Sequence, residues 1–250
     1  MEERKRTSRQ YWDNLYRDHP LRAMAPHDKI REWIEKQLQP SDSGGSLLEI
    51  GCFPGTYSAV FGDLGYELNG VDWAARTSEL EPWFASRGYC VGRFVKDDFF
   101  NFQTDRKYDV VASFGFIEHF TAWEDVVERH IALVAEGGHL VLEVPNFFGA
   151  LQRWTHRVLD RESYERHHVP AMDVAKWARI AQERGLEVRF LGYFGGFDFW
   201  TEPQDRNMLS RVGVRLLRKA ADRLRHVDLP DHRVYSPFAG MIARRRRQRL

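Results

Sequence analysis

Strand-like apolar segments alternate with helix-like amphipathic segments along the first 146 residues of the chain. The strand-like segments span residues 46–51, 67–74, 89–95, 107–120 (where the strand runs into a loop) and 139–146. The helix-like segments between them span residues 56–65, 75–87 and 123–134. This alternation indicates βαβ units, because parallel neighbours need a long crossover connection, usually a helix. We therefore predict an α/β fold with a doubly wound, mostly parallel sheet.

The pattern changes after residue 146. Two further strand-like segments, at 186–194 and 236–245, bring the expected number of strands to seven. The stretches 146–170 and 195–235 do not continue the alternation, and they are long for simple connections. We interpret both stretches as insertions that shape a substrate pocket, since long loops on a rigid sheet commonly carry binding residues.

Two helices are expected before the first strand, at residues 9–18 and 27–38. In the second of these, Ile30, Trp33, Ile34 and Leu38 recur at helical spacing. We predict that residues 1–40 form a helical lid. Residues 41–250 would then form the main domain, with the two insertions built into it.

Charge and cysteine content limit the classes of partner. The 37 Lys and Arg residues are balanced by 36 Asp and Glu residues, so no overall field attracts nucleic acid or a membrane. Two cysteines without metal-type spacing favour a reducing, cytoplasmic location. No segment is apolar enough to span a bilayer. The arginine cluster at 244–249 is either a solvated tail or a contact for a polyanion.

The turn after the first strand, LLEIGCFPGT at 47–56, predicts a nucleoside site. Ligands of doubly wound sheets bind at the carboxyl ends of the strands. Gly51 and Gly55 let the backbone turn sharply and approach a ligand closely. Asp72 ends the second strand, near the offset at which an acid binds ribose hydroxyls. The run is neither a G-x-G-x-x-G dinucleotide fingerprint nor a phosphate-binding loop with G-K-[ST].

Five motifs in order over residues 46–146 resemble those of class I S-adenosylmethionine (SAM) methyltransferases. LLEIGCFPG resembles their first motif, GVDWA the acidic motif of the second strand, and KDDFF the segment that reads adenine. YDVVASFGFIEHF resembles the fourth-strand motif, and LVAEGGHLVLEVPN the fifth-strand signature. The resemblance implies a Rossmann-like methyltransferase fold with an antiparallel last strand, and SAM as cofactor.

The resemblance also implies which residues bind the cofactor. Backbone at Gly51 and Cys52 would hold the methionine end, Glu49 would orient the turn, and Asp98 would accept from the adenine amine. Phe53 and Pro54 depart from the glycine-rich pattern, so Phe53 must turn away from the cofactor or partly cover it. The full predicted set is Glu49, Gly51, Cys52, Phe53, Gly55, Asp72, Trp73, Asp98, Phe99, Ser113 and Phe114.

Glu118, His119 and His168 are the candidate catalytic residues. Methyl transfer to a hydroxyl needs alignment and removal of a proton, and histidine and carboxylate suit that task. Relatives that bind a divalent cation carry E-x-x-E-H in the fourth-strand motif, whereas this chain has Gly115 at the first Glu position. A divalent metal is therefore the less favoured alternative, and we assign no metal ligand. The alternative for His119 is a helix-capping or packing histidine. Of the pair in ERHHVP we expect His168 to face the pocket.

These features favour a SAM-dependent methyltransferase that acts on a hydroxyl of a small molecule, such as a sugar or secondary metabolite. A methyltransferase of RNA or protein is the nearest alternative, although no charge excess supports binding to nucleic acid. A second alternative is a SAM-binding scaffold without catalysis. The aromatic N-terminal helices and the 195–235 insertion could also form the face of a homodimer.

Overall fold

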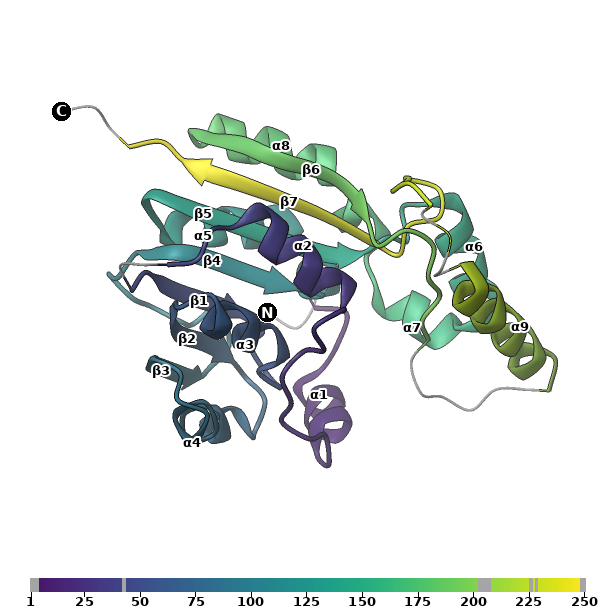
Figure 1. The fold of residues 1–250 in the computed structure, drawn as a ribbon, viewed down its shortest axis with the longest axis horizontal. Helices are drawn as coiled ribbons and strands as arrows, with labels where there is room; N and C mark the ends of the chain where they lie inside the picture. The colour runs from purple at the N-terminus through teal and green to yellow at the C-terminus, as the bar shows by residue number, and fades with distance from the viewer. Residues whose placement is uncertain (1–4, 42–43, 202–207, 225–226, 228, 248–250) are drawn as a thin grey trace.

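A seven-stranded sheet organises the protein, seen here in a computed structural model that describes residues 5–41, 44–201, 208–224, 227 and 229–247 (Figure 1). The strand order is β3-β2-β1-β4-β5-β7-β6. The strands are β1 (Ser46–Ile50), β2 (Glu67–Asp72), β3 (Val91–Lys96), β4 (Tyr108–Phe114), β5 (Val134–Pro145), β6 (Leu186–Phe194) and β7 (Phe238–Arg245). Strands β1 to β5 pair in parallel, and β7 is antiparallel to both of its neighbours. The predicted α/β fold and its antiparallel last strand are confirmed.

Helices cover both faces of the sheet. The helical elements are α1 (Arg9–Tyr16), α2 (Lys29–Gln37), α3 (Thr56–Asp63), η2 (Thr77–Glu79), α4 (Leu80–Ser86), η3 (Ile117–His119), α5 (Trp123–Leu133), α6 (Ala150–Leu159), α7 (Arg161–Arg166), η4 (Val169–Met172), α8 (Val174–Glu183) and α9 (Met208–Leu224). Apolar residues of α2, α3 and α4 join one buried cluster, and those of α5 and α8 join another. The helices α6, α7 and α9 lie apart, beyond the ends of β4 and β5 (Figure 1).

The fifth strand begins earlier than its sequence indicates. We expected a strand from residue 139, after a helix stopped by Gly137 and Gly138, but β5 starts at Val134. Val134 pairs with Tyr108, and the register then shifts before Val110 pairs with His139. Gly137 has φ of +78°, a left-handed value that a glycine adopts without strain. The two glycines therefore form an irregularity within a longer strand.

The N-terminal segment contains two helices with different environments. Helix α2 buries Ile30, Trp33 and Ile34 against the sheet, and the Trp33 ring stacks on Phe194 of β6 at 4.5 Å between centroids. Helix α1 buries none of its residues fully and lies below the carboxyl ends of the strands (Figure 1). Within the expected lid, α2 is thus a helix of the core. Residues 1–4 of the lid, and 202–207, 225–226 and 228 of the second insertion, lie outside the described residues.

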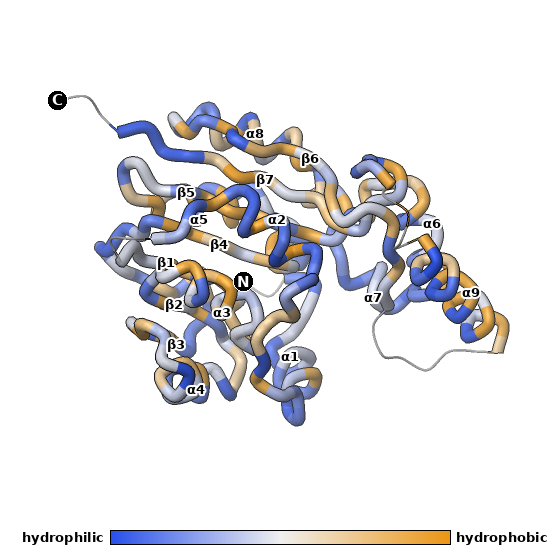
Figure 2. The backbone as a smooth tube through the Cα atoms, viewed as in Figure 1, coloured by the Kyte–Doolittle hydropathy of each residue, from blue (hydrophilic) through white to orange (hydrophobic). Residues whose placement is uncertain are grey.

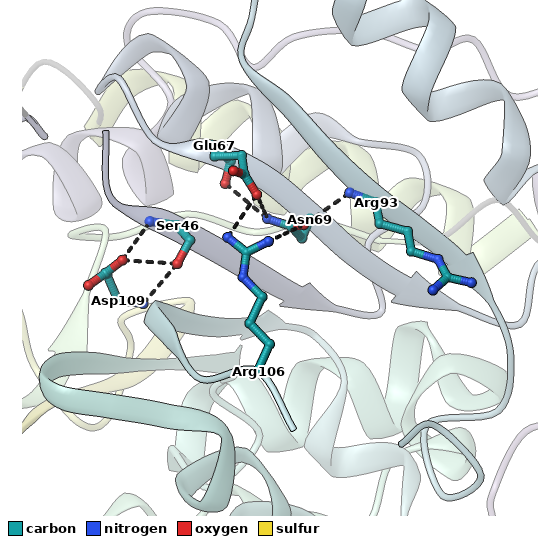
Figure 3. Close-up of polar contacts among 6 residues, drawn as sticks. All are labelled: Ser46, Glu67, Asn69, Arg93, Arg106 and Asp109. Atoms are coloured by element: carbon teal, nitrogen blue, oxygen red, sulfur yellow. Dashed lines mark hydrogen bonds and ion pairs between the residues drawn. The ribbon is translucent and has the colours of Figure 1, made fainter. Parts of the chain in front are cut away.

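Two groups of polar contacts lie at the amino ends of the parallel strands (Figure 3). The Asp109 carboxylate accepts from the backbone N–H of Ser46 at 2.8 Å and from its hydroxyl at 2.9 Å. The Arg106 guanidinium pairs with Glu67 at 2.9 Å, and Glu67 also accepts from Asn69 at 2.9 Å. These groups satisfy one another, so this edge of the sheet is held by pairs that need no ligand.

Hydrophobic residues are frequent along the central strands, whereas the end of β7 and residues 246–247 are hydrophilic (Figure 2). At that end, Arg244 donates to the carbonyl of Gly137 at 3.1 Å, and Arg245 donates to that of Ile131 at 2.7 Å. Two arginines of the C-terminal cluster therefore connect β7 to the end of α5 and the start of β5. Arg249 lies outside the described residues. Within the described residues we find no helix whose length and apolar character would let it cross a bilayer.

Candidate active site

A cavity of about 330 Å³ lies where β1, β2 and β4 end. This is the crevice in which doubly wound folds bind their ligands. The N-terminal segment supplies one wall, and the turns after the strands supply the others. The lining residues are Lys5, Thr7, Trp12, Tyr16, His19, Arg22, Gly51, Phe53, Pro54, Thr56, Tyr57, Val71, Asp72, Trp73, Asp97, Asp98, Phe99, Phe114, Gly115, Phe116, His119 and Phe120.

The turn after β1 requires its glycines. Gly51 has φ of +77° and Gly55 has φ of +86°, values that side-chain-bearing residues rarely adopt. A Cβ on Gly51 would also lie 2.6 Å from Cδ2 of Phe116, which therefore closes over the bare backbone. Gly55 caps the start of α3. The predicted role of these glycines in allowing a sharp turn agrees with this geometry.

Phe53 forms part of the cavity wall and is buried. Its ring lies 5.0 Å from that of Tyr16, and the guanidinium of Arg76 lies 5.4 Å from the ring centre. Arg76 in turn donates to the backbone carbonyls of Tyr16 and His19. Phe53 thus joins the glycine turn to the end of α1, and its peptide bond to Pro54 is cis.

Asp72 lies at the carboxyl end of β2 and lines the cavity. Its two oxygens accept from the backbone N–H groups of Phe53 at 3.0 Å and of Ala74 at 2.8 Å. Burial raises the pKa of Asp72 to about 6, although these hydrogen bonds favour the charged form. Backbone donors therefore fix the carboxylate while its remaining lone pairs are available to a ligand in the cavity.

Four of the predicted cofactor residues do not line the cavity. Glu49 is buried and accepts a hydrogen bond from Ser58 of α3, and burial raises its pKa to about 8. Cys52 packs against Gly70, where an added Cβ would lie 2.6 Å from Sγ. Ser113 is fully buried within β4, and Gly55 lies behind the turn. These four residues support the cavity walls, whereas the other seven predicted residues lie on the cavity surface.

Asp98, Trp73 and Lys5 lie together at one end of the cavity. Asp98 follows β3, and Trp73 follows β2. The Lys5 ammonium forms an ion pair with the Asp98 carboxylate and lies 3.9 Å from the centre of the Trp73 ring. The sequence predicted Asp98 and Trp73 as ligand-binding residues but gave no indication that Lys5 joins them.

Glu118, His119 and His167 form a buried group near the end of β4. One ligand atom of each lies within 4.8 Å of the others, and Nε2 of His167 is 3.9 Å from the Glu118 carboxylate. His119 Nδ1 is 3.3 Å from the carbonyl of Arg166, and His167 Nδ1 contacts that of Ser163. These carbonyls can only accept, so each Nδ1 carries the proton and each Nε2 keeps a free lone pair. Of the three residues, His119 lines the cavity.

Burial sets the ionisation of this group. It raises the pKa of Glu118 to about 8 and lowers that of His119 to about 4. The pKa of His167 is also lowered, first by burial and then by the charge of His119. Near neutral pH both imidazoles are therefore neutral bases. Both carboxyl oxygens of Glu118 are buried without a hydrogen-bond partner among the described residues.

The same three side chains could hold a divalent ion. Two neutral imidazoles whose Nδ1 atoms are fixed by carbonyls are a common arrangement for metal ligands, and a carboxylate could complete the set. At Gly115, where the motif resemblance implies a further acidic ligand in cation-binding relatives, an added Cβ would lie 3.6 Å from Glu118 Oε1. A longer side chain there would point at the group, but this chain has none.

The structure brings His167, and not His168, beside His119. The two rings are 4.8 Å apart, whereas His168 does not line the cavity and contacts Glu118 through its backbone N–H at 2.6 Å. The choice between adjacent histidines depends on how α7 ends, because His167 bonds the carbonyl of Ser163 four residues earlier. That spacing is visible in the sequence, but the end of the helix is not.

Comparison with known proteins identifies the family. Residues 21–190 match a family described as "Methyltransferase domain". The chain belongs to this methyltransferase family. Among solved structures, the methyltransferase resembles a SAM-dependent methyltransferase from Archaeoglobus fulgidus, with a TM-score of 0.56 and 17% identity over 86% of this chain and 93% of the other. Family and fold together make the protein a SAM-dependent methyltransferase, as its motifs predicted.

Two further relatives are informative. The methyltransferase is 28% identical over 189 residues to the ubiquinone biosynthesis O-methyltransferase of Bordetella avium, a match that covers 71% of this chain and 75% of that protein. It also resembles the SAH-bound structure of magnesium protoporphyrin IX methyltransferase from Synechocystis, with a TM-score of 0.52 and 15% identity over 86% and 80% of the two chains. The first likeness bears on function, and the second on the fold alone.

Proposed function

We propose that the methyltransferase catalyses O-methylation of a small molecule, with His119 as the base that accepts the hydroxyl proton. The position of His119 carries this proposal. Its neutral ring lines the cavity, and its proton-bearing Nδ1 faces the carbonyl of Arg166. Its Nε2 is thus the atom able to accept a proton. The relative from Bordetella avium, an O-methyltransferase by name, supports the same reaction.

The chain's own residues would hold SAM at the glycine turn. Gly51 offers bare backbone with no room for a Cβ, and Asp72 would accept from the ribose hydroxyls. Asp98 and Trp73 would contact the adenine. SAM supplies a methyl group on a positively charged sulfur. These residues would place that group near His119, which lines the same cavity.

The proton would move in step with the methyl group. SAM would supply the methyl group to the acceptor oxygen and would leave as SAH, and His119 Nε2 would accept the proton of the acceptor hydroxyl. The charged imidazole would then lie beside Glu118. A nearby positive charge favours ionisation of a carboxyl group, so Glu118 could pair with the imidazolium.

The proposal is tested in two steps. Calorimetric titration with S-adenosylhomocysteine (SAH), with and without EDTA or Mg²⁺, measures cofactor binding and its dependence on metal. Transfer of a labelled methyl group from SAM to phenol, catechol, sugar and amine acceptors then identifies the acceptor atom. We expect metal-independent SAH binding and label in a hydroxyl compound. Label in amines alone, or in RNA or protein alone, would refute the proposed acceptor class.

A further inference from the structure

The ammonium of Lys5 occupies the end of the cavity assigned to adenine. It forms an ion pair with Asp98, and the side chains of the two residues are only 13% and 22% exposed. The same ammonium lies over the Trp73 ring, 3.9 Å from its centre, a cation–π distance. Lys5 therefore uses the acceptor and the aromatic face that the sequence had assigned to the cofactor.

Adenine and the Lys5 ammonium need the same kinds of contact, a hydrogen-bond acceptor and an aromatic face. The amino group of adenine is a hydrogen-bond donor that needs an acceptor, and the flat ring packs well against an aromatic side chain. An ammonium is also a donor, and it is also attracted to an aromatic face. We propose that Lys5 is an internal competitor for the adenine subsite, and that the cofactor must displace it to bind. This inference rests on the proposed placement of adenine at Asp98.

The segment that carries Lys5 also borders the catalytic end of the cavity. Lys5 forms a β-bridge with Phe120, and the backbone N–H of Arg6 donates to the carbonyl of His119 at 2.8 Å. Thr7 accepts from the indole N–H of Trp12 at 3.0 Å, and the Trp12 ring meets the His119 ring edge-on at 5.1 Å. Residues 5–7 thus connect the adenine subsite to His119.

Displacing Lys5 therefore has a consequence at His119. Once the ion pair with Asp98 is lost, one of the contacts that hold residues 5–7 against Phe120 and His119 is gone. The segment would then be freer to leave His119, and the acceptor would gain access to it. The expected order is that the cofactor binds first and the acceptor second.

Removal of the ammonium provides the test. In Lys5→Met the side chain keeps its length but loses its charge, so SAH no longer competes with an ion pair. We expect Lys5→Met to bind SAH about two- to tenfold more tightly than the wild type, the range set by a partly exposed ion pair. Lys5→Arg, which keeps the charge, should bind like the wild type. Lys29→Met, which removes an exposed lysine paired with Glu32 at 3.1 Å, is the matched control.

Hydrogen exchange gives a second readout. SAH should speed exchange of the Arg6 amide in the wild type, and Lys5→Met should show faster exchange without SAH. If the wild type binds SAH and Lys5→Met binds it no more tightly, the proposed competition is overturned. Weaker binding by Lys5→Met would make Lys5 a cover over the bound cofactor. Failure of the wild type and all variants to bind SAH would instead refute the proposed cofactor site.

Discussion

A glutamate lies at each end of the parallel strands, Glu67 at the amino ends and Glu118 at the carboxyl ends, and the pKa values of the two are shifted in opposite directions. At the amino ends, Glu67 pairs with Arg106 and Asn69, and hydrogen bonding to Asn69 lowers its pKa. At the carboxyl ends, Glu118 has no hydrogen-bond partner among the described residues, and burial raises its pKa to about 8. The pKa values of these two carboxyl groups thus shift in opposite directions, because Glu67 is half-buried and hydrogen-bonded whereas Glu118 is fully buried.

This difference separates groups that hold the fold from groups kept for chemistry. A paired carboxylate stabilises the chain and gains nothing from a ligand. An unpaired buried carboxyl group carries a free-energy cost, and such costs are common where a substrate, ion or proton is to be received. The comparison can be tested by making similar substitutions at the two ends of the sheet and measuring stability, SAH binding and methyl transfer in each variant.

His119→Ala should give the largest effect. Loss of a positioned base typically slows the chemical step by about 10²- to 10⁴-fold. SAH affinity should remain near the wild-type value, because His119 is assigned to the acceptor. Single-turnover methyl transfer and SAH titration measure the two effects separately. His139→Gln, a change toward the amino end of β5 where residue 139 pairs with Arg244, is the control and should leave the rate unaltered.

Asp72→Asn should give the next largest effect. The amide keeps one acceptor for Phe53 or Ala74 but loses the charge that would bind ribose hydroxyls. Hydrogen bonds to charged groups contribute about 1.5–3 kcal/mol, so SAH affinity should fall roughly 10- to 100-fold. Asp109→Asn, the same change at the amino ends, should cost stability and leave SAH affinity unaltered. Equal SAH affinity in both variants would remove Asp72 from the cofactor site.

Glu118→Gln should make stability less dependent on pH. The folded protein holds a proton on Glu118 up to about pH 8, whereas the unfolded chain releases it near 4.5. The stability that this proton contributes is therefore complete below pH 4.5 and is lost as the pH rises through 8. Glutamine resembles the protonated acid at every pH, so the variant should gain in melting temperature over the wild type as the pH rises from 5 to 8.5. A constant difference would contradict the raised pKa.

Arg106→Gln should have the smallest effect. The guanidinium is 45% exposed, and exposed ion pairs contribute about 0–1 kcal/mol. We expect a small loss of stability in urea titration and no change in SAH binding or methyl transfer. A loss of activity would show that the amino ends of the strands also influence the reaction.

Seven of the residues that the sequence patterns predicted to bind the cofactor line the cavity. Asp72, Trp73, Asp98, Phe99 and Phe114 lie at or just after strand ends, and a parallel sheet brings these positions to one edge. Their place followed from strand order alone. For the same reason, residues within a strand or behind the turn, such as Ser113 and Glu49, were harder to separate from residues that face the cavity.

The remaining features depend on packing between distant segments. Lys5 contacts Asp98, which lies 93 residues later in the sequence, and a lysine among other charged residues near the N-terminus carries no pattern. His167 was passed over because the end of α7 decides which of two histidines turns inward. The early start of β5 depends on the pairing of Val134 with Tyr108, which no local propensity specifies.

The position of β7 has a consequence for how the chain is made. In the described sheet β6 has β7 as its neighbour, and β7 is the only strand that joins it to β5. During synthesis the parallel strands β1 to β5 can pair as they emerge, whereas β6 must wait without a partner until Phe238–Arg245 has been added. Such an unpaired strand is a site for aggregation. A ribosome that stops before residue 238 would therefore release a chain that lacks β7 and contains β6 without its partner strand.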